Sequence, residues 1–120
     1  MSDLQTPTAE ITPIGSPAAS MELPLVLIAD ADARSRDRRA QQLELRGFRV
    51  SVARTAFEAI VKACCHLPDL ILVDGSLGAD GAEETTELLS TCPATAHIPI
   101  VRLRPGRRLP SSVLAAAAAR

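Results

Sequence analysis

Three aspartates stand directly after apolar runs of this sequence, where their side chains can meet. Asp30 and Asp32 follow residues 25–29, and Asp74 follows residues 70–73. If both runs are strands of an open α/β sheet, these acids lie beyond the strand ends, where ligands and chemistry gather. Clustered carboxylates repel one another and need a hard dication such as Mg²⁺, which prefers oxygen ligands. With a metal bound, Asp74 can act as a nucleophile toward a phosphoryl group.

Strands and helices alternate along the chain and must position these acids. Residues 25–29 and 70–73 are unbroken apolar runs, which are typical of strands buried on both faces. Residues 48–53 alternate apolar and polar positions and predict a half-buried edge strand, and residues 98–103 predict a fourth strand. Helices are expected over residues 35–46 and 82–90, and from Ser111 or Ser112 to Arg120. A further helix begins at a Thr55–Glu58 capping box, and its apolar residues Phe57, Ile60, Val61 and Cys64 repeat at helical spacing.

This order of elements predicts the fold class. Strands that alternate with helices indicate an α/β protein with a three-layer, doubly wound parallel sheet. We expect a flavodoxin-like sheet with strand order 2-1-3-4, in which the fifth strand is missing. Residues 1–22 are rich in Ser, Thr, Pro and Ala and predict a disordered N-terminal tail. Residues 23–120 then form one domain.

Composition excludes several classes of function. The chain has 120 residues, a net charge of -1, and neither Trp nor Tyr, so we expect no nucleic-acid partner. No apolar run approaches the roughly 20 residues of a membrane span, and no signal peptide is apparent, which together predict a cytoplasmic protein without a membrane partner.

The three cysteines lack metal-ligand spacing and are interpreted as reduced, mostly packed thiols. A solvated helix face is the preferred interpretation of Arg34, Arg36, Arg38 and Arg39.

Four segments in this order resemble the receiver domain of bacterial response regulators. The resemblance covers residues 25 to about 114 and rests on residues 25–32, 46–60, 68–74 and 95–101. It implies a phosphoacceptor domain in two-component phosphorelay signal transduction, which is not an enzyme. The implied partner is a histidine kinase or a phosphotransfer protein.

The resemblance also assigns roles to single residues. Asp74 matches the aspartate that accepts the phosphoryl group, and Asp30 matches the first residue of the acidic pair that binds Mg²⁺. Ala31 stands where the family has a second acid, so Asp32 either substitutes for it or points away from the site. Ser76 matches the position whose backbone carbonyl binds the metal. The implied metal set is therefore Asp30, Asp32, Asp74 and Ser76, with weakened Mg²⁺ binding.

Several departures from the family pattern bear on mechanism. Gly78 replaces the usual proline after the phosphoacceptor, and Arg104 stands at the switch position, where the family has Ser or Thr. The resemblance implies a receiver domain that is incomplete at its C-terminus, so we expect the lysine of the family's fifth strand to be missing. A guanidinium at Arg104 suits both Asp74 and a phosphate, and it can hold one state permanently. Arg102, a charge within a strand, indicates that strand four is an open edge, which invites a homodimer or a partner protein.

Two other functions compete with phosphoryl acceptance. A degenerate pseudo-receiver would keep the fold and act as a phosphorylation-independent protein-interaction module, as the changes at Ala31 and Arg104 suggest. A phosphohydrolase of the haloacid dehalogenase type would use Asp30-Ala-Asp32 as its nucleophile motif. That motif requires Thr or Val where this chain has Arg34, and the chain is short for the family's remaining residues.

Overall fold

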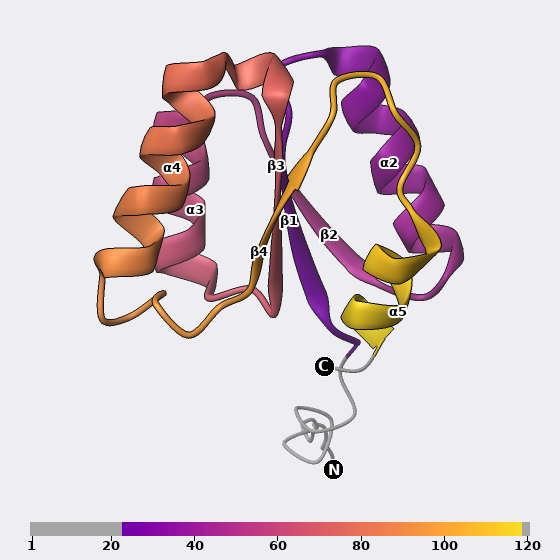
Figure 1. Ribbon diagram of the computed structural model, residues 1–120. Helices are drawn as coiled ribbons and strands as arrows, with labels where there is room; N and C mark the ends of the chain where they lie inside the picture. The colour runs from indigo at the N-terminus through magenta and orange to yellow at the C-terminus, as the bar shows by residue number, and fades with distance from the viewer. Residues whose placement is uncertain (1–22, 119–120) are drawn as a thin grey trace, which may run out of the picture.

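A four-stranded parallel sheet forms the centre of the molecule (Figure 1). The computed structural model describes residues 23–118, so the tail expected over 1–22 and the last two residues lie outside the description. The strands are β1 (Leu25–Ala29), β2 (Arg49–Ala53), β3 (Leu70–Asp74) and β4 (Ile100–Leu103). Their order is β2-β1-β3-β4, which confirms the predicted topology.

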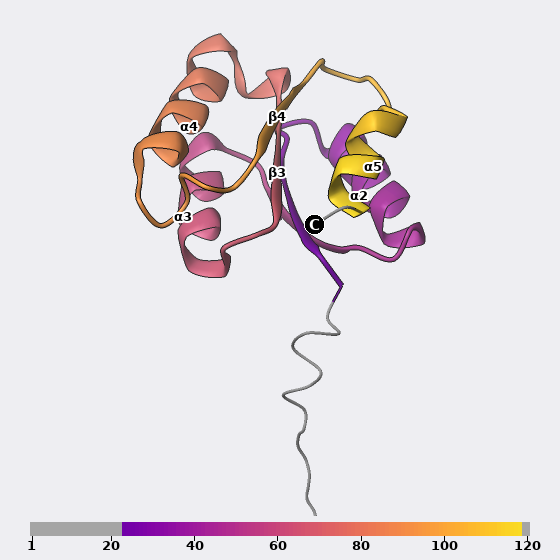
Figure 2. The same ribbon diagram turned by 60° about the horizontal axis from the view of Figure 1, so that its bottom comes forward.

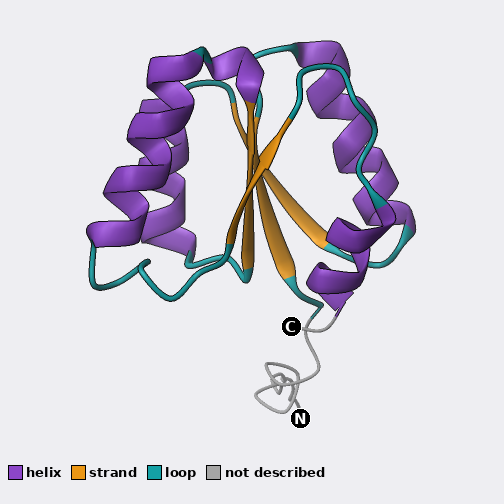
Figure 3. Ribbon diagram, in the orientation of Figure 1, coloured by secondary structure: helices purple, strands orange, loops and turns teal. Residues whose placement is uncertain are grey.

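Helices cover both faces of the sheet and make the three layers (Figures 1 and 3). They are α2 (Ala33–Leu45), α3 (Ala56–His66), α4 (Ala79–Thr91) and α5 (Ser111–Ala118), and a short 3-10 helix η2 (Gly75–Leu77) follows β3. Helices α2 and α5 lie on one face, and α3 and α4 lie on the other, as the turned view in Figure 2 also shows. Helix α4 begins three residues earlier than predicted, because Gly78 turns the chain with a φ of 86° and accepts the first helical hydrogen bond from Ala82.

The two central strands alternate their side chains between two cores. Val26 and Ile28 of β1 join the cluster beneath α2 and α5, whereas Leu27 and Ala29 join the cluster beneath α3 and α4. Strand β3 alternates in the same way. Burial of each Leu, Ile or Val side chain stabilises the fold by about 1.5–3 kcal/mol. The unbroken apolar runs therefore mark strands covered on both faces, as predicted.

Helix α3 is amphipathic, but its inward face differs from the predicted one. Phe57 is 77% exposed and Val61 is 42% exposed, while Ala59 and Ala63 are fully buried. Small alanines let the helix backbone approach the sheet closely, so the larger apolar side chains remain at the rim. The interpretation of the cysteines as mostly packed is also wrong for Cys64 and Cys65, which are exposed at the end of this helix.

Strand β4 is an edge of the sheet in the described part of the chain. Arg102 lies within it, pairs in register with Val73 of β3, and has an exposed side chain. The charge is therefore tolerated because it lies at an edge, as the sequence predicted. Among the helices of residues 23–118, none combines the length and apolar character needed to cross a membrane.

Candidate functional site

Two of the three predicted acids come together at the carboxyl ends of the central strands. Asp30 follows β1, and Asp74 is the last residue of β3, which pairs with β1 in parallel. Both side chains are fully buried. Two buried carboxylates at one edge of a sheet need a positive charge or protons, because the charged form is costly away from water.

Arg39 of α2 supplies that positive charge. Its Nη1 donates to Oδ2 of Asp30 at 3.2 Å and also to Oδ1 of Asp74. The Arg39 side chain has no exposed surface and is the largest fully buried side chain among the described residues. The guanidinium therefore bridges the two acids from a helix on one face of the sheet.

Every N–H of the Arg39 guanidinium has a hydrogen-bond partner. Besides the two carboxylates, the backbone carbonyl of Arg107 accepts from Nε at 3.1 Å and from Nη2 at 2.6 Å. The carbonyl of Arg104 accepts from Nη2 at 2.8 Å. A guanidinium has five N–H donors, so this set uses all of them. The buried charge is thus both paired and fully hydrogen-bonded, which is the condition under which burial is tolerated.

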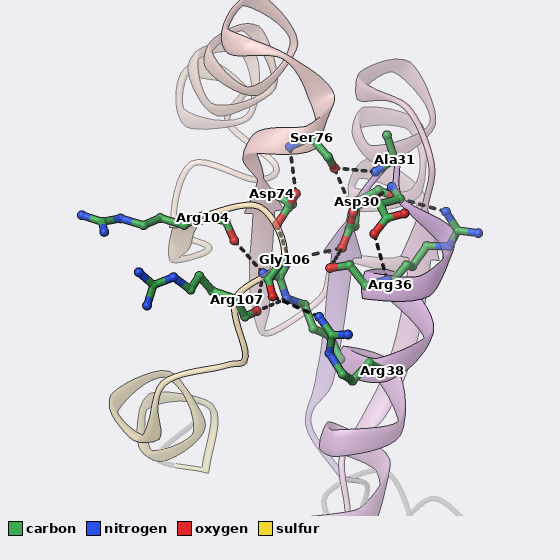
Figure 4. Close-up of polar contacts among 12 residues, drawn as sticks. Asp30, Ala31, Arg36, Arg38, Asp74, Ser76, Arg104, Gly106 and Arg107 are labelled. Carbon is green, nitrogen blue, oxygen red and sulfur yellow. Dashed lines mark hydrogen bonds and ion pairs between the residues drawn. The ribbon is translucent and has the colours of Figure 1, made fainter.

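The remaining carboxylate oxygens are also occupied (Figure 4). Oδ2 of Asp30 accepts from the Ser35 hydroxyl at 2.6 Å, and its Oδ1 accepts from the Ser76 hydroxyl at 2.9 Å. Oδ2 of Asp74 accepts from the backbone N–H of Ser76 at 2.8 Å. The Ser76 hydroxyl in turn accepts from the backbone N–H of Ala31 at 2.9 Å. Ser76 therefore joins the β1 and β3 ends through its hydroxyl and its N–H.

Asp32 does not bring its carboxylate to this pocket. Its exposed side chain caps α2 and accepts from the backbone N–H of Ser35 at 3.2 Å. Only its own N–H contacts the pocket, by donating to Oδ1 of Asp30 at 2.9 Å. The sequence left two options open for Asp32, and the structure shows the one in which its carboxylate points away from the pocket.

Arg104 contributes its backbone, not its guanidinium. Of the two ligands that the sequence offered its side chain, Asp74 or a phosphate, Asp74 is not contacted in this structure. Strand β4 ends at Leu103, and the chain then turns so that the carbonyl of Arg104 faces the pocket and the exposed side chain points away from it (Figure 4). The cation beside Asp74 is Arg39 instead.

These residues do not fit a Mg²⁺ ion in their present arrangement. Mg²⁺ demands near-octahedral oxygen ligands. The guanidinium of Arg39 lies between the two buried carboxylates, and the third expected acid caps a helix. Within residues 23–118, no cluster of three or more His, Cys, Asp or Glu side chains is placed to hold a metal.

Arg39 and Ser35 are site residues that sequence reasoning missed. The interpretation of the α2 arginines as a solvated face holds for Arg34 and Arg38, which are exposed, and is wrong for Arg39. A signal was present in the spacing, because Ser35, Arg39 and Leu43 recur every four residues and share the buried face of the helix. An arginine on the same stripe as a core leucine predicts a buried partner for its charge.

Solved structures similar to this chain are response regulator receiver domains. The N-terminal domain of a response regulator receiver protein from Methanoculleus marisnigri JR1 is 26% identical, with a TM-score of 0.66 and coverage of 80% of each chain. A CheY-like receiver domain protein from Methanospirillum hungatei JF-1 is 26% identical, with a TM-score of 0.57 and coverage of 80% of this chain and 77% of that one. The chemotaxis protein CheY4 of Vibrio cholerae is 22% identical, with a TM-score of 0.64 and coverage of 80% and 79%. No protein-family model matches the chain, and no curated protein matches it.

Proposed function

We propose that this chain is a receiver-type signalling domain of a two-component system that works as a phosphorylation-independent protein-interaction module. The likeness to receiver domains supports the signalling class. The single observation that carries the second part is the buried Arg39, which bridges Asp30 and Asp74. Because the Arg39 guanidinium balances the charge of the two carboxylates, the pocket needs no metal ion to do so.

Phosphoryl acceptance at Asp74 demands an accessible carboxylate oxygen. In this structure Arg39 binds Oδ1, the Ser76 N–H binds Oδ2, and the side chain is fully buried. For a phosphodonor to reach Asp74, Arg39 must leave and give up all its hydrogen bonds. Each hydrogen bond to a charged group contributes about 1.5–3 kcal/mol, so this departure is costly.

Phosphorylation of Asp74 by a histidine kinase or phosphotransfer protein, with Mg²⁺ held near Asp30, remains the second candidate. Its support is the position of Asp74 at the end of β3, with Asp30 beside it, in a fold shared with receiver domains. The haloacid dehalogenase alternative loses its basis, because Asp32 caps α2 instead of facing the pocket.

The two candidates differ in one measurement. The wild-type chain and Asp74→Ala are incubated with acetyl phosphate and MgCl₂, and their intact masses are recorded over time. We expect no mass gain that depends on Asp74. A phosphoryl adduct on the wild type that is absent from the variant would overturn the proposal and establish the phosphoacceptor.

The proposed partner surface is the open edge of β4, whose Ile100–Leu103 backbone pairs only with β3 among the described strands. A second chain that adds a strand here would make main-chain hydrogen bonds without any change at Asp74. The strand can come from a histidine kinase, a phosphotransfer protein or another copy of this chain. Size-exclusion chromatography with light scattering separates the last case from the other two.

A further inference from the structure

Four exposed arginines surround a pocket at the end of β4. The pocket has a volume of about 720 Å³. We call it the arginine pocket. Its lining residues are Arg39, Arg102, Leu103, Arg104, Gly106, Arg107, Arg108 and Pro110. No acidic residue is among them, so the wall is strongly positive.

The four exposed guanidinium groups have no carboxylate partner among the residues that the structure describes. Ion pairs form at Arg39 and at Lys62, whereas no ion pair among the described residues involves Arg102, Arg104, Arg107 or Arg108. Like charges held close together repel one another. An anion in the pocket would relieve this repulsion, whereas a cation or a neutral apolar ligand would not.

Side chains of α2 hold the backbone of the arginine pocket in place. Arg39 holds the backbone carbonyls of Arg104 and Arg107, and Nη2 of Arg38 donates to the carbonyl of Gly106 at 3.1 Å. Gly106 has a φ of 73°, a conformation that glycine adopts without strain. Because the carbonyls face inward, the side chains of Arg104 and Arg107 point outward (Figure 4). The backbone that carries these side chains is therefore fixed before any ligand arrives, which lowers the ordering cost of binding.

We propose that the arginine pocket binds a phosphate-bearing small molecule of the nucleoside phosphate class. Its volume falls within the range of roughly 300–1,000 Å³ that is typical of small-molecule sites. A planar guanidinium fork matches the oxygens of a phosphate, and two forks on one short segment suit a chain of phosphates. Leu103 and Pro110 add an apolar wall.

A second hollow favours a nucleotide over a bare phosphate. It measures about 460 Å³ and shares Gly106 and Arg108 with the arginine pocket. Gln41 and Gln42 also line it, and their amides both donate and accept hydrogen bonds. A ligand with phosphates among the arginines can place a polar ring system there. Arg39 links this pocket to Asp74, but none of the four exposed side chains contacts Asp74, so ligand binding here can be measured separately from phosphoryl acceptance there.

Calorimetric titration of the full chain with ATP, and separately with tripolyphosphate, tests this site. We expect saturable binding of ATP at one site per chain, with tripolyphosphate binding more weakly. In Arg104→Gln/Arg107→Gln the affinity for ATP falls by about tenfold or more, as expected for lost charge-assisted hydrogen bonds. The backbone carbonyls that hold Arg39 are retained in this variant, and circular dichroism verifies its fold.

The matched control is Arg34→Gln/Arg46→Gln. It removes the same charge from exposed positions that line neither hollow, so its affinity stays within about twofold of the wild type. Equal losses in both variants would show non-specific charge attraction and overturn the site. The proposal also fails if ATP does not saturate, or if an acidic peptide or a DNA duplex binds more tightly than ATP. Equal affinity for tripolyphosphate and ATP would overturn its nucleoside part.

Discussion

Asp30 and Asp74 would repel each other unless a positive charge lay between them, and in this protein a side chain of the same chain provides it. A guanidinium on a helix is permanent, unlike a metal ion that exchanges with solvent. It also carries directional hydrogen bonds, so it fixes the geometry of the segment that follows β4 as well as the charge of the pocket.

Arg39→Gln removes the positive charge that Asp30 and Asp74 share. Removal of the charge leaves two buried carboxylates uncompensated, so the free energy of unfolding falls by about 3–5 kcal/mol. Added Mg²⁺ then raises the melting temperature of the variant, because a dication can now enter between the acids, and leaves the wild type unchanged. Thermal unfolding with and without MgCl₂ measures both effects. Stabilisation of the wild type by Mg²⁺ would contradict the role of Arg39 as the resident cation.

The pKa values of the Cys92 and Cys64 thiols shift in opposite directions. Hydrogen bonds from the backbone of Ala94 and then from the Thr95 side chain lower the pKa of Cys92. Partial desolvation of the thiol, followed by the effect of nearby Cys92, raises the pKa of Cys64. Because the thiolate is the nucleophile, iodoacetamide at mildly alkaline pH should alkylate Cys92 before Cys64.

Peptide mass spectrometry over a time course reads the order of alkylation. Exposure alone predicts the reverse order, since Cys64 is exposed and Cys92 is only partly so. Faster labelling of Cys64 would therefore show that access, not thiolate content, governs the reaction.

The elements of this domain were largely predictable, because their signals are local. The apolar runs of β1 and β3 and the Thr55 cap of α3 all appear where the sequence indicated. The inward face of α3 was not predictable from apolar spacing, because close packing selected Ala59 and Ala63 over the larger Phe57.

The acidic pocket was only half predictable for a related reason. The topology brings Asp30 and Asp74 together, and the strand pattern reveals that topology. The bridge from Arg39 depends on carbonyls that lie more than sixty residues away in the chain, and no local pattern reports them.

The capping box at the start of α3 stabilises the helix by two hydrogen bonds. The Thr55 hydroxyl accepts from the backbone N–H of Glu58 at 3.0 Å, and the Glu58 carboxylate accepts from the backbone N–H of Arg54 at 2.7 Å. Thr55→Ala should lower the free energy of unfolding by about 1 kcal/mol. Urea denaturation measures the change. The control is Thr91→Ala, whose hydroxyl donates to carbonyls of its own helix and whose loss should cost less than about 0.5 kcal/mol.

The same cap makes stability depend on pH. The hydrogen bond from Arg54 is the main cause that lowers the pKa of Glu58. Because the folded-state pKa of Glu58 is lowered, the stability that its ionised carboxylate contributes is complete above the unfolded-state pKa. That stability is lost as pH falls through the folded-state pKa. Glu58→Gln should therefore lose less stability on acidification than the wild type. Parallel acid denaturation curves for the two proteins would contradict this role.

For the whole molecule, the exposed edge of β4 decides whether the domain stays dispersed. Arg102 places a charge in the middle of a short apolar strand, which discourages unspecific pairing of this edge and leaves it to a partner strand of complementary charge. Arg102→Val should therefore increase self-association, which dynamic light scattering detects at rising concentration. Arg108→Val removes the same charge outside the strand and should leave association unchanged; equal association in both variants would indicate lost repulsion instead of edge pairing.

The contacts of Arg39 also determine when the domain can be completed. Helix α2 leaves the ribosome early, yet the carbonyls that satisfy its arginine come from residues 65 and 68 positions later. Until those residues emerge, the nascent domain holds a guanidinium that cannot be buried without a large penalty. Folding of the domain therefore waits until residues 104–107 have emerged, and an arrested or cleaved product ending near β4 should stay open and be recognised by chaperones and proteases.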